Sequence, residues 1–134
     1  MMGTLMEHVW VDAMELMEIA NELVAGCREG REEANLDKLY APDAVSVEAM
    51  DMGNGRETVG VEGIKGKHAW FGSMYEILDG TVGDPFPHGP DRFAVTFNMK
   101  AKNKETGVVE DMEEVALYHV ADGKIVREEF FYTE

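Results

Sequence analysis

The residues of this sequence best suited to chemistry are acidic, and Glu48, Glu114 and Glu129 lie in segments with the pattern of β-strands. A carboxylate enclosed away from water has a raised pKa, near the value that a general acid or base needs. Glu114 and Glu129 each belong to a Glu-Glu pair, and a strand sends the two members of such a pair to opposite faces of its sheet. A sheet covered on one face would therefore enclose some of these acids.

Each acid also has a purely structural interpretation. Glu129 lies two residues from Arg127 on the same face of a strand, and a neighbouring guanidinium lowers the pKa of a carboxyl. We therefore expect these two to form an ion pair, which Glu114 could join as part of a structural network. Glu48 has no basic neighbour in sequence, so for this residue the structural and the catalytic interpretations stay equally open.

Other reactive residue types indicate no site of their own. The four histidines lack the spacing of a metal-binding motif, so tertiary structure alone would have to assemble a metal site. Cys27 is the single cysteine, and neither Ser46 nor Ser73 lies in a nucleophile elbow. The glycines before Lys67 imitate a phosphate-binding loop without its spacing. We expect no bound metal and no cofactor.

Length and composition predict one globular domain over residues 1–134. The chain has 45% hydrophobic and 29% charged residues, which is ordinary for a globular protein of this size. Its net charge of -15 repels phosphate backbones and anionic lipid headgroups. No apolar run is long enough to span a membrane, and the acidic N-terminal segment is unlike a signal peptide. We expect a cytoplasmic protein that binds neither nucleic acid nor membranes.

Hydrophobic spacing predicts three helices in the first part of the chain. Apolar residues recur every three or four positions over 9–27, which indicates an amphipathic helix. A short second helix over 36–40, with Asn35 as its candidate N-cap, must end before Pro42. Alternation then predicts a strand over 45–50, a glycine-rich stretch follows over 51–60, and a third helix is expected over 62–75.

The second part of the chain has the pattern of a strand meander. We expect a bent strand over 77–86, strands over 93–102 and 112–120, and a last strand over 125–132. Asp122-Gly123 is a two-residue hairpin signal that pairs Ala121 with Lys124. Continued without interruption, this register sets Glu114, Ala116 and Tyr118 beside Phe131, Glu129 and Arg127. Together these elements predict helices packed on one face of a curved antiparallel sheet.

Two segments carry a family resemblance. The run LYAPDAV at 39–45 and the closing segment VALYHVADGKIVREEFFY at 115–132 resemble the SnoaL-like branch of the nuclear transport factor 2 superfamily. The order of the elements agrees over nearly the whole chain. The resemblance implies an α+β fold of the cystatin-like class, in which three helices pack inside a curved, mostly antiparallel sheet that forms a cone-shaped barrel. It also implies a pocket at the open end of the cone and a homodimer through the outer sheet face.

Within this resemblance, Glu48 falls where the ketosteroid isomerases place a proton-shuttling carboxylate. Ala116 stands where cyclases and isomerases of the superfamily have a catalytic aspartate, and the first helix lacks the isomerases' tyrosine. Glu114, one pleat from Ala116, could take over part of that role as an acid. We expect Glu48 and Glu114 to be catalytic, and we expect the pocket to be lined by Met50, His68, Trp70, Phe71, Tyr118, Arg127, Glu129 and Phe131.

Two functions follow from these expectations. The first is an isomerase, cyclase or hydrolase without a cofactor, in which Glu48 acts as general base on a small apolar or amphipathic substrate. The second is a non-catalytic protein of the same fold that binds a small ligand or serves as a dimeric interaction module. The fold hosts many unrelated activities, so the walls of the pocket must decide between them.

Overall fold

The computed structural model of this protein describes the backbone of residues 2–133 and the side chains of residues 15–133, so the first part of the predicted amphipathic helix pattern lies outside the described side chains. The elements follow one another as α1 (Met2–Glu29), α2 (Glu32–Leu39), β1 (Tyr40–Val47), β2 (Glu57–Val59), α3 (Val61–Met74), β3 (Tyr75–Val82), β4 (Phe86–His88), β5 (Arg92–Asn103), β6 (Val109–Ala121) and β7 (Lys124–Phe131). No helix within the described residues is long and apolar enough to cross a membrane.

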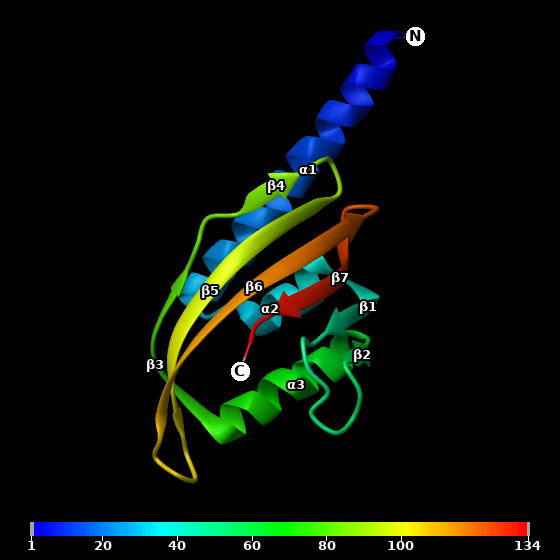
Figure 1. Ribbon diagram of the computed structural model, residues 1–134. Helices are drawn as coiled ribbons and strands as arrows, with labels where there is room; N and C mark the ends of the chain where they lie inside the picture. The colour runs from blue at the N-terminus through cyan, green and yellow to red at the C-terminus, as the bar shows by residue number, and fades with distance from the viewer. Residues whose placement is uncertain (1, 134) are drawn as a thin grey trace.

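One curved sheet organises the molecule. Its strands follow the order β2-β1-β7-β6-β5-β3, and β4 pairs with β5. Only β1 and β7 are parallel among the strand pairs of residues 2–133; the other pairs are antiparallel. The long strands β5 and β6 bend around the helices (Figure 1), and the sheet stays open, with β2 and β3 at its edges. The predicted fold, three helices packed in a curved and mostly antiparallel sheet, is confirmed.

The core lies between the helices and the concave face of the sheet. From α1 it receives Leu16, Ala20 and Leu23, whose spacing gives the helix one apolar stripe. This stripe faces the alternate residues of β5, among them Phe93 and Val95, which are fully buried. The inner face of the cone is therefore filled with hydrocarbon at the end where α1 crosses β5.

Close packing joins α1 to α2. Gly30, with a φ of 77°, ends α1 and allows the chain to turn. Asn35 is not the N-cap that the sequence suggested, because α2 begins at Glu32 and Asn35 lies inside it. Its buried side chain instead donates a hydrogen bond through Nδ2 to the backbone oxygen of Glu22, over 3.2 Å. The amide thus fixes the angle between the two helices.

Several strand boundaries differ from those expected. β1 begins at Tyr40, and its register with β7 shifts between Tyr40 and Val45, so Pro42 is accommodated in an irregular stretch. The glycine-rich stretch contains the short strand β2, which pairs with β1. The bent strand expected over 77–86 is divided into β3 and β4; between them, Gly83 still donates a hydrogen bond to the backbone oxygen of Thr96 in β5.

The hairpin between β6 and β7 has the predicted turn but a different register. Asp122 and Gly123 both have positive φ, and Ala121 pairs with Lys124. A bulge follows, because Val120 pairs with Ile125 whereas His119 pairs with Arg127, which leaves Val126 as an extra residue. The uninterrupted register predicted from the sequence is therefore wrong.

The bulge exchanges the two faces of β7. Ala116 pairs with Phe130, and Tyr118 pairs with Glu128. Because Ala116 and Tyr118 are buried on the concave side, Glu128 and Phe130 also face inward. Their neighbours Arg127, Glu129 and Phe131 point to the outer face, contrary to the sequence-based expectation.

Candidate functional site

Charged and phenolic side chains meet at the open end of the cone. Glu48 directly follows β1, Lys67 belongs to α3, and Tyr132 directly follows β7. The Lys67 Nζ lies 2.5 Å from Glu48 Oε1, and the Tyr132 hydroxyl donates a hydrogen bond to Glu48 Oε2 over 3.0 Å. Both oxygens of this partly buried carboxylate therefore have a donor. We call the region around Glu48, Lys67, Tyr132 and Glu114 the mouth.

A second carboxylate lies deeper, behind the mouth. Glu128 is buried on the inner face of β7. Its Oε1 accepts a hydrogen bond from the Tyr40 hydroxyl, and its Oε2 accepts one from Ser46 Oγ over 2.6 Å. Ser46 Oγ also accepts a hydrogen bond from Lys67 Nζ over 2.8 Å. A chain of hydrogen bonds thus runs from the interior to the ammonium at the mouth.

Glu114 approaches the mouth from β6 and is the acid with the most altered titration there. Its pKa is raised to about 7; burial is the largest cause, the negative charges of Glu48 and Glu128 also raise the pKa, and the charge of Lys67 lowers it. Among the side chains of residues 15–133, none forms a hydrogen bond with the Glu114 carboxyl. An acid in this state holds its proton up to neutral pH and has a free donor to offer to a ligand.

Tyr132 remains a hydrogen-bond donor at any physiological pH. Burial is the largest cause of its raised pKa of about 12, followed by the charge of Glu48 and the hydrogen bond to it, while a backbone hydrogen bond with Met50 lowers it. Beside it, Lys67 Nζ lies 5.6 Å from the centre of the Phe130 ring, close enough for a cation–π interaction. The mouth therefore combines two acids, one fixed ammonium and two aromatic rings.

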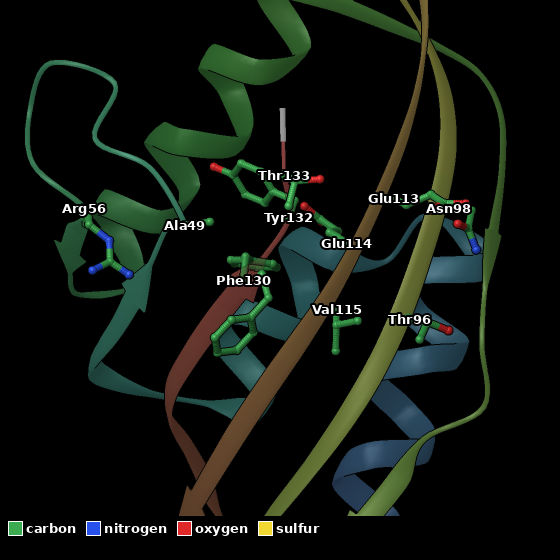
Figure 2. Close-up of a pocket in the computed structure, with 11 residues that line it drawn as sticks. Ala49, Arg56, Thr96, Asn98, Glu113, Glu114, Val115, Phe130, Tyr132 and Thr133 are labelled. Atoms are coloured by element: carbon green, nitrogen blue, oxygen red, sulfur yellow. The ribbon is translucent and has the colours of Figure 1, made fainter.

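A hollow of about 740 Å³ opens where β7 stops and β6 continues. In Figure 2 the Glu114 side chain points toward Tyr132, while Glu113 and Asn98 lie on the other side of β6. The hollow thus extends from the mouth across the end of β7 to the outer face. Its lining consists of Ala49, Arg56, Thr96, Asn98, Glu113, Glu114, Val115, Phe130, Phe131, Tyr132 and Thr133.

The structure brings together only some of the residues that the sequence suggested. Glu48 and Glu114 share the mouth, and the backbone of Met50 reaches the Tyr132 hydroxyl. Phe131 lines the outer part of the hollow. Tyr118 lies deeper, buried and stacked on Phe93 with 4.9 Å between ring centres.

Other predicted residues lie away from the mouth. His68 turns to α2, where its Nδ1 lies 2.5 Å from Glu33 Oε1. Trp70 is exposed, and Phe71 stacks on Tyr75.

On the outer face, Arg127 pairs with Glu129 over 3.4 Å and lies 3.9 Å from Glu57. This is the ion pair expected for Arg127 and Glu129, although it forms on the opposite side of the sheet from the predicted one. No group of three or more His, Cys, Asp or Glu residues within the described chain is arranged to hold a metal ion.

Sequence reasoning missed Lys67, Tyr132 and Glu128 as members of the site. Glu128 and Glu129 are adjacent in a strand, so the sequence did indicate that one of them faces inward. The bulge, which the sequence does not reveal, makes that residue Glu128 instead of Glu129. No sequence pattern indicated that Lys67 belongs to the site, because only the packing of α3 beside β1 brings it to Glu48. The uninterrupted register sets Phe131 beside Glu114, and its neighbour Tyr132 would then point to the opposite face of the sheet.

Comparisons with known proteins agree with this architecture. The family model described as a SnoaL-like domain matches residues 14–132. A candidate SnoaL-like polyketide cyclase from Mesorhizobium loti is 34% identical, with a TM-score of 0.81; the match covers 87% of this chain and 98% of that one. None of the curated proteins matches this chain in sequence.

More distant structures share the fold alone. A nuclear-transport-factor-2-like protein from Burkholderia thailandensis has a TM-score of 0.76 at 16% identity, covering 87% of this chain and 89% of that one. A protein with a ketosteroid isomerase-like fold from Catenulispora acidiphila, solved with trimethylamine, has a TM-score of 0.67 at 20% identity. That match covers 87% of this chain and 85% of the other.

Proposed function

This chain belongs to the SnoaL-like domain family, and on that premise we propose that its mouth performs acid–base chemistry on a small apolar or amphipathic molecule without a cofactor. The observation that carries the proposal is the contrast between two neighbouring acids. Glu48 is an ion-paired carboxylate that accepts hydrogen bonds, whereas Glu114 has a pKa of about 7 and no hydrogen-bond partner among the described side chains. Environments that differ in this way assign a base and an acid.

The proposed reaction is a proton transfer at a carbon atom beside a carbonyl group. Glu48 removes the proton from the carbon, while protonated Glu114 donates a hydrogen bond to the carbonyl oxygen, where negative charge develops. Glu48 then returns the proton to the same or another carbon, so no atom is gained or lost. The Lys67 ammonium stays in place throughout and stabilises Glu48 whenever it is ionised.

The second candidate function is binding without chemistry. Ala116 stands where the family resemblance implies an aspartate, and both oxygens of Glu48 already have a partner in Lys67 or Tyr132, so neither oxygen is free to approach a substrate carbon. In this alternative, Glu114 would donate a hydrogen bond that orients the ligand and no bond would be made or broken.

Hydrogen–deuterium exchange discriminates between the two functions. The protein is incubated in D₂O with a panel of small apolar ketones and aldehydes, and loss of the α-hydrogen signal is followed by proton NMR. Catalysis predicts faster exchange for at least one compound, and Glu48→Gln should slow it by about 10²- to 10⁴-fold, the usual contribution of a general base. The melting temperature should change by only a few degrees, because the Lys67 ion pair is partly exposed.

Glu129→Gln is the matched control, since it removes a carboxylate of the outer face. Its exchange rate should equal that of the native protein. Shifts of ligand resonances without any α-hydrogen exchange would support the binding function. A Glu48→Gln variant that exchanges at the native rate would remove Glu48 from the reaction.

The proposed partner, besides the small ligand, is a second copy of this chain on the outer sheet face. Val115 and Phe131 are cross-strand partners on that face, and they are 40% and 49% exposed. Apolar side chains left open in this way favour burial against another surface. The ion pairs of Arg127 with Glu57 and Glu129 would flank the contact.

A further inference from the structure

Glu128 is a buried carboxylate that the proposed reaction does not use. It is 3% exposed, and a carboxylate removed from water is strongly destabilising unless hydrogen bonds or an opposite charge compensate it. None of the ion pairs found among the described side chains includes Glu128. Its compensation must therefore come from the hydrogen-bond chain behind the mouth.

The direction of each hydrogen bond in this chain is fixed. An ionised carboxylate can only accept, so the Tyr40 and Ser46 hydroxyls must both donate to Glu128. The single hydroxyl hydrogen of Ser46 is thereby used, and its oxygen has only lone pairs to offer. Lys67 Nζ, 2.8 Å away, donates to that oxygen.

Lys67 is consequently held from several sides. Its Nζ donates to Ser46 Oγ, contacts Glu48 Oε1 at 2.5 Å, and lies 5.6 Å from the centre of the Phe130 ring. A lysine side chain is otherwise long and mobile, and fixing it costs conformational entropy. The hydrogen bond from Ser46 to Glu128 holds the Ser46 oxygen in place as an acceptor for Lys67, and this helps to offset that cost.

We propose that Glu128 is a positioning residue, which acts through Ser46 to hold the Lys67 ammonium against Glu48. Replacing it should free Lys67 although the two side chains share no direct hydrogen bond. The consequence for catalysis rests on the proposed function of Glu48. The restraint on Lys67 does not depend on that function, and it can be measured without a substrate.

The test is the rate at which each lysine is acetylated by an N-hydroxysuccinimide ester, read by mass spectrometry of peptides. The reagent attacks an amine nitrogen that is free of its partners, so Lys67 should react roughly three- to tenfold faster in Glu128→Gln and in Ser46→Ala, the change expected for one lost hydrogen bond. Lys65, on the same helix and paired with Asp37, is the internal reference and should react at its native rate.

Glu129→Gln is the matched control, because it makes the same chemical change one residue along β7 on the outer face. Its Lys67 rate should be native. Ser46→Ala measures the restraint that Ser46 supplies by itself. Should Glu128→Gln fail to fold, Glu128→Asp, whose shorter side chain withdraws the carboxylate from Ser46, is measured in its place. A native Lys67 rate in a folded Glu128 variant, or in folded Ser46→Ala, overturns the proposal, whatever the deuterium exchange assay shows.

Discussion

The Glu114 carboxyl couples folding to pH. Burial and the charges of Glu48 and Glu128 all disfavour its ionised form, and together they raise its pKa from 4.5 to about 7. Between these two pH values the folded protein keeps a proton that the unfolded chain releases. The contribution of Glu114 to stability is therefore fully present below pH 4.5 and is lost as the pH rises through 7.

Glu114→Gln should abolish this pH dependence, because glutamine has a similar shape and no charge to desolvate. At pH 8 we expect the variant to exceed the native protein in free energy of unfolding by roughly 2 kcal/mol, and at pH 4.5 the two should be nearly equal. Urea denaturation at the two pH values measures the difference. Glu113→Gln, which alters the exposed neighbour on the opposite face of β6, should show no such change with pH. A gain from Glu114→Gln that is the same at both pH values would contradict the raised pKa.

At the scale of elements, periodicity was enough to predict the three helices and the main strands. One face of β5 and β6 is buried, so apolar and polar residues alternate along these strands, and this alternation can be recognised in the sequence. The bulge in β7 has no such sequence pattern, because Val126 is an ordinary strand residue and only tertiary packing makes it the extra residue of the bulge. That single insertion decides whether Glu128 or Glu129 enters the core.

The mouth was only partly predictable, because tertiary packing decides which elements meet there. Glu48 and Glu114 were found because each lies in a strand-like segment, where the face of a side chain can be reasoned from its neighbours. Lys67 joins them from α3, 19 residues after Glu48 along the chain. Spacing along a helix says which residues share its faces but not which strand end the helix meets.

The corner between α1 and α2 offers a test of how closely these elements pack. A Cβ atom added at Gly26 would lie 2.0 Å from Asn35 Nδ2, so Gly26→Ala must displace the buried amide and break its hydrogen bond to Glu22. We expect the free energy of unfolding to fall by about 2 kcal/mol, measured by urea denaturation.

A double-mutant cycle isolates this contact. In an Asn35→Ala background the space is free, and Gly26→Ala should be neutral or stabilise by up to about 1 kcal/mol, because alanine is the better helix former. An equal loss in both backgrounds would show that Asn35 is not what excludes a side chain at position 26.

At the scale of the whole molecule, the net charge determines how strongly two copies of the chain repel each other. The chain has a net charge of -15, so two copies repel each other, and this repulsion weakens as salt shortens the range of electrostatic interactions. The outer face also carries the apolar pair Val115 and Phe131 at the rim of the hollow. Burying that pair against a second copy would cover the outer opening and leave the mouth as the route to Glu114.

Association through this face should therefore strengthen as salt is added, since repulsion is screened while apolar burial persists. Sedimentation equilibrium at low and at moderate salt measures the dimer dissociation constant. Val115→Glu should raise that constant at least about tenfold, because each interface would lose an apolar contact and gain a charge. Val108→Glu, at an exposed position beside the turn between β5 and β6, provides the same change away from the face and should leave the constant unchanged. A dimer insensitive to Val115→Glu would have to form through another surface, and the hollow would then stay open to solvent on both sides of the sheet.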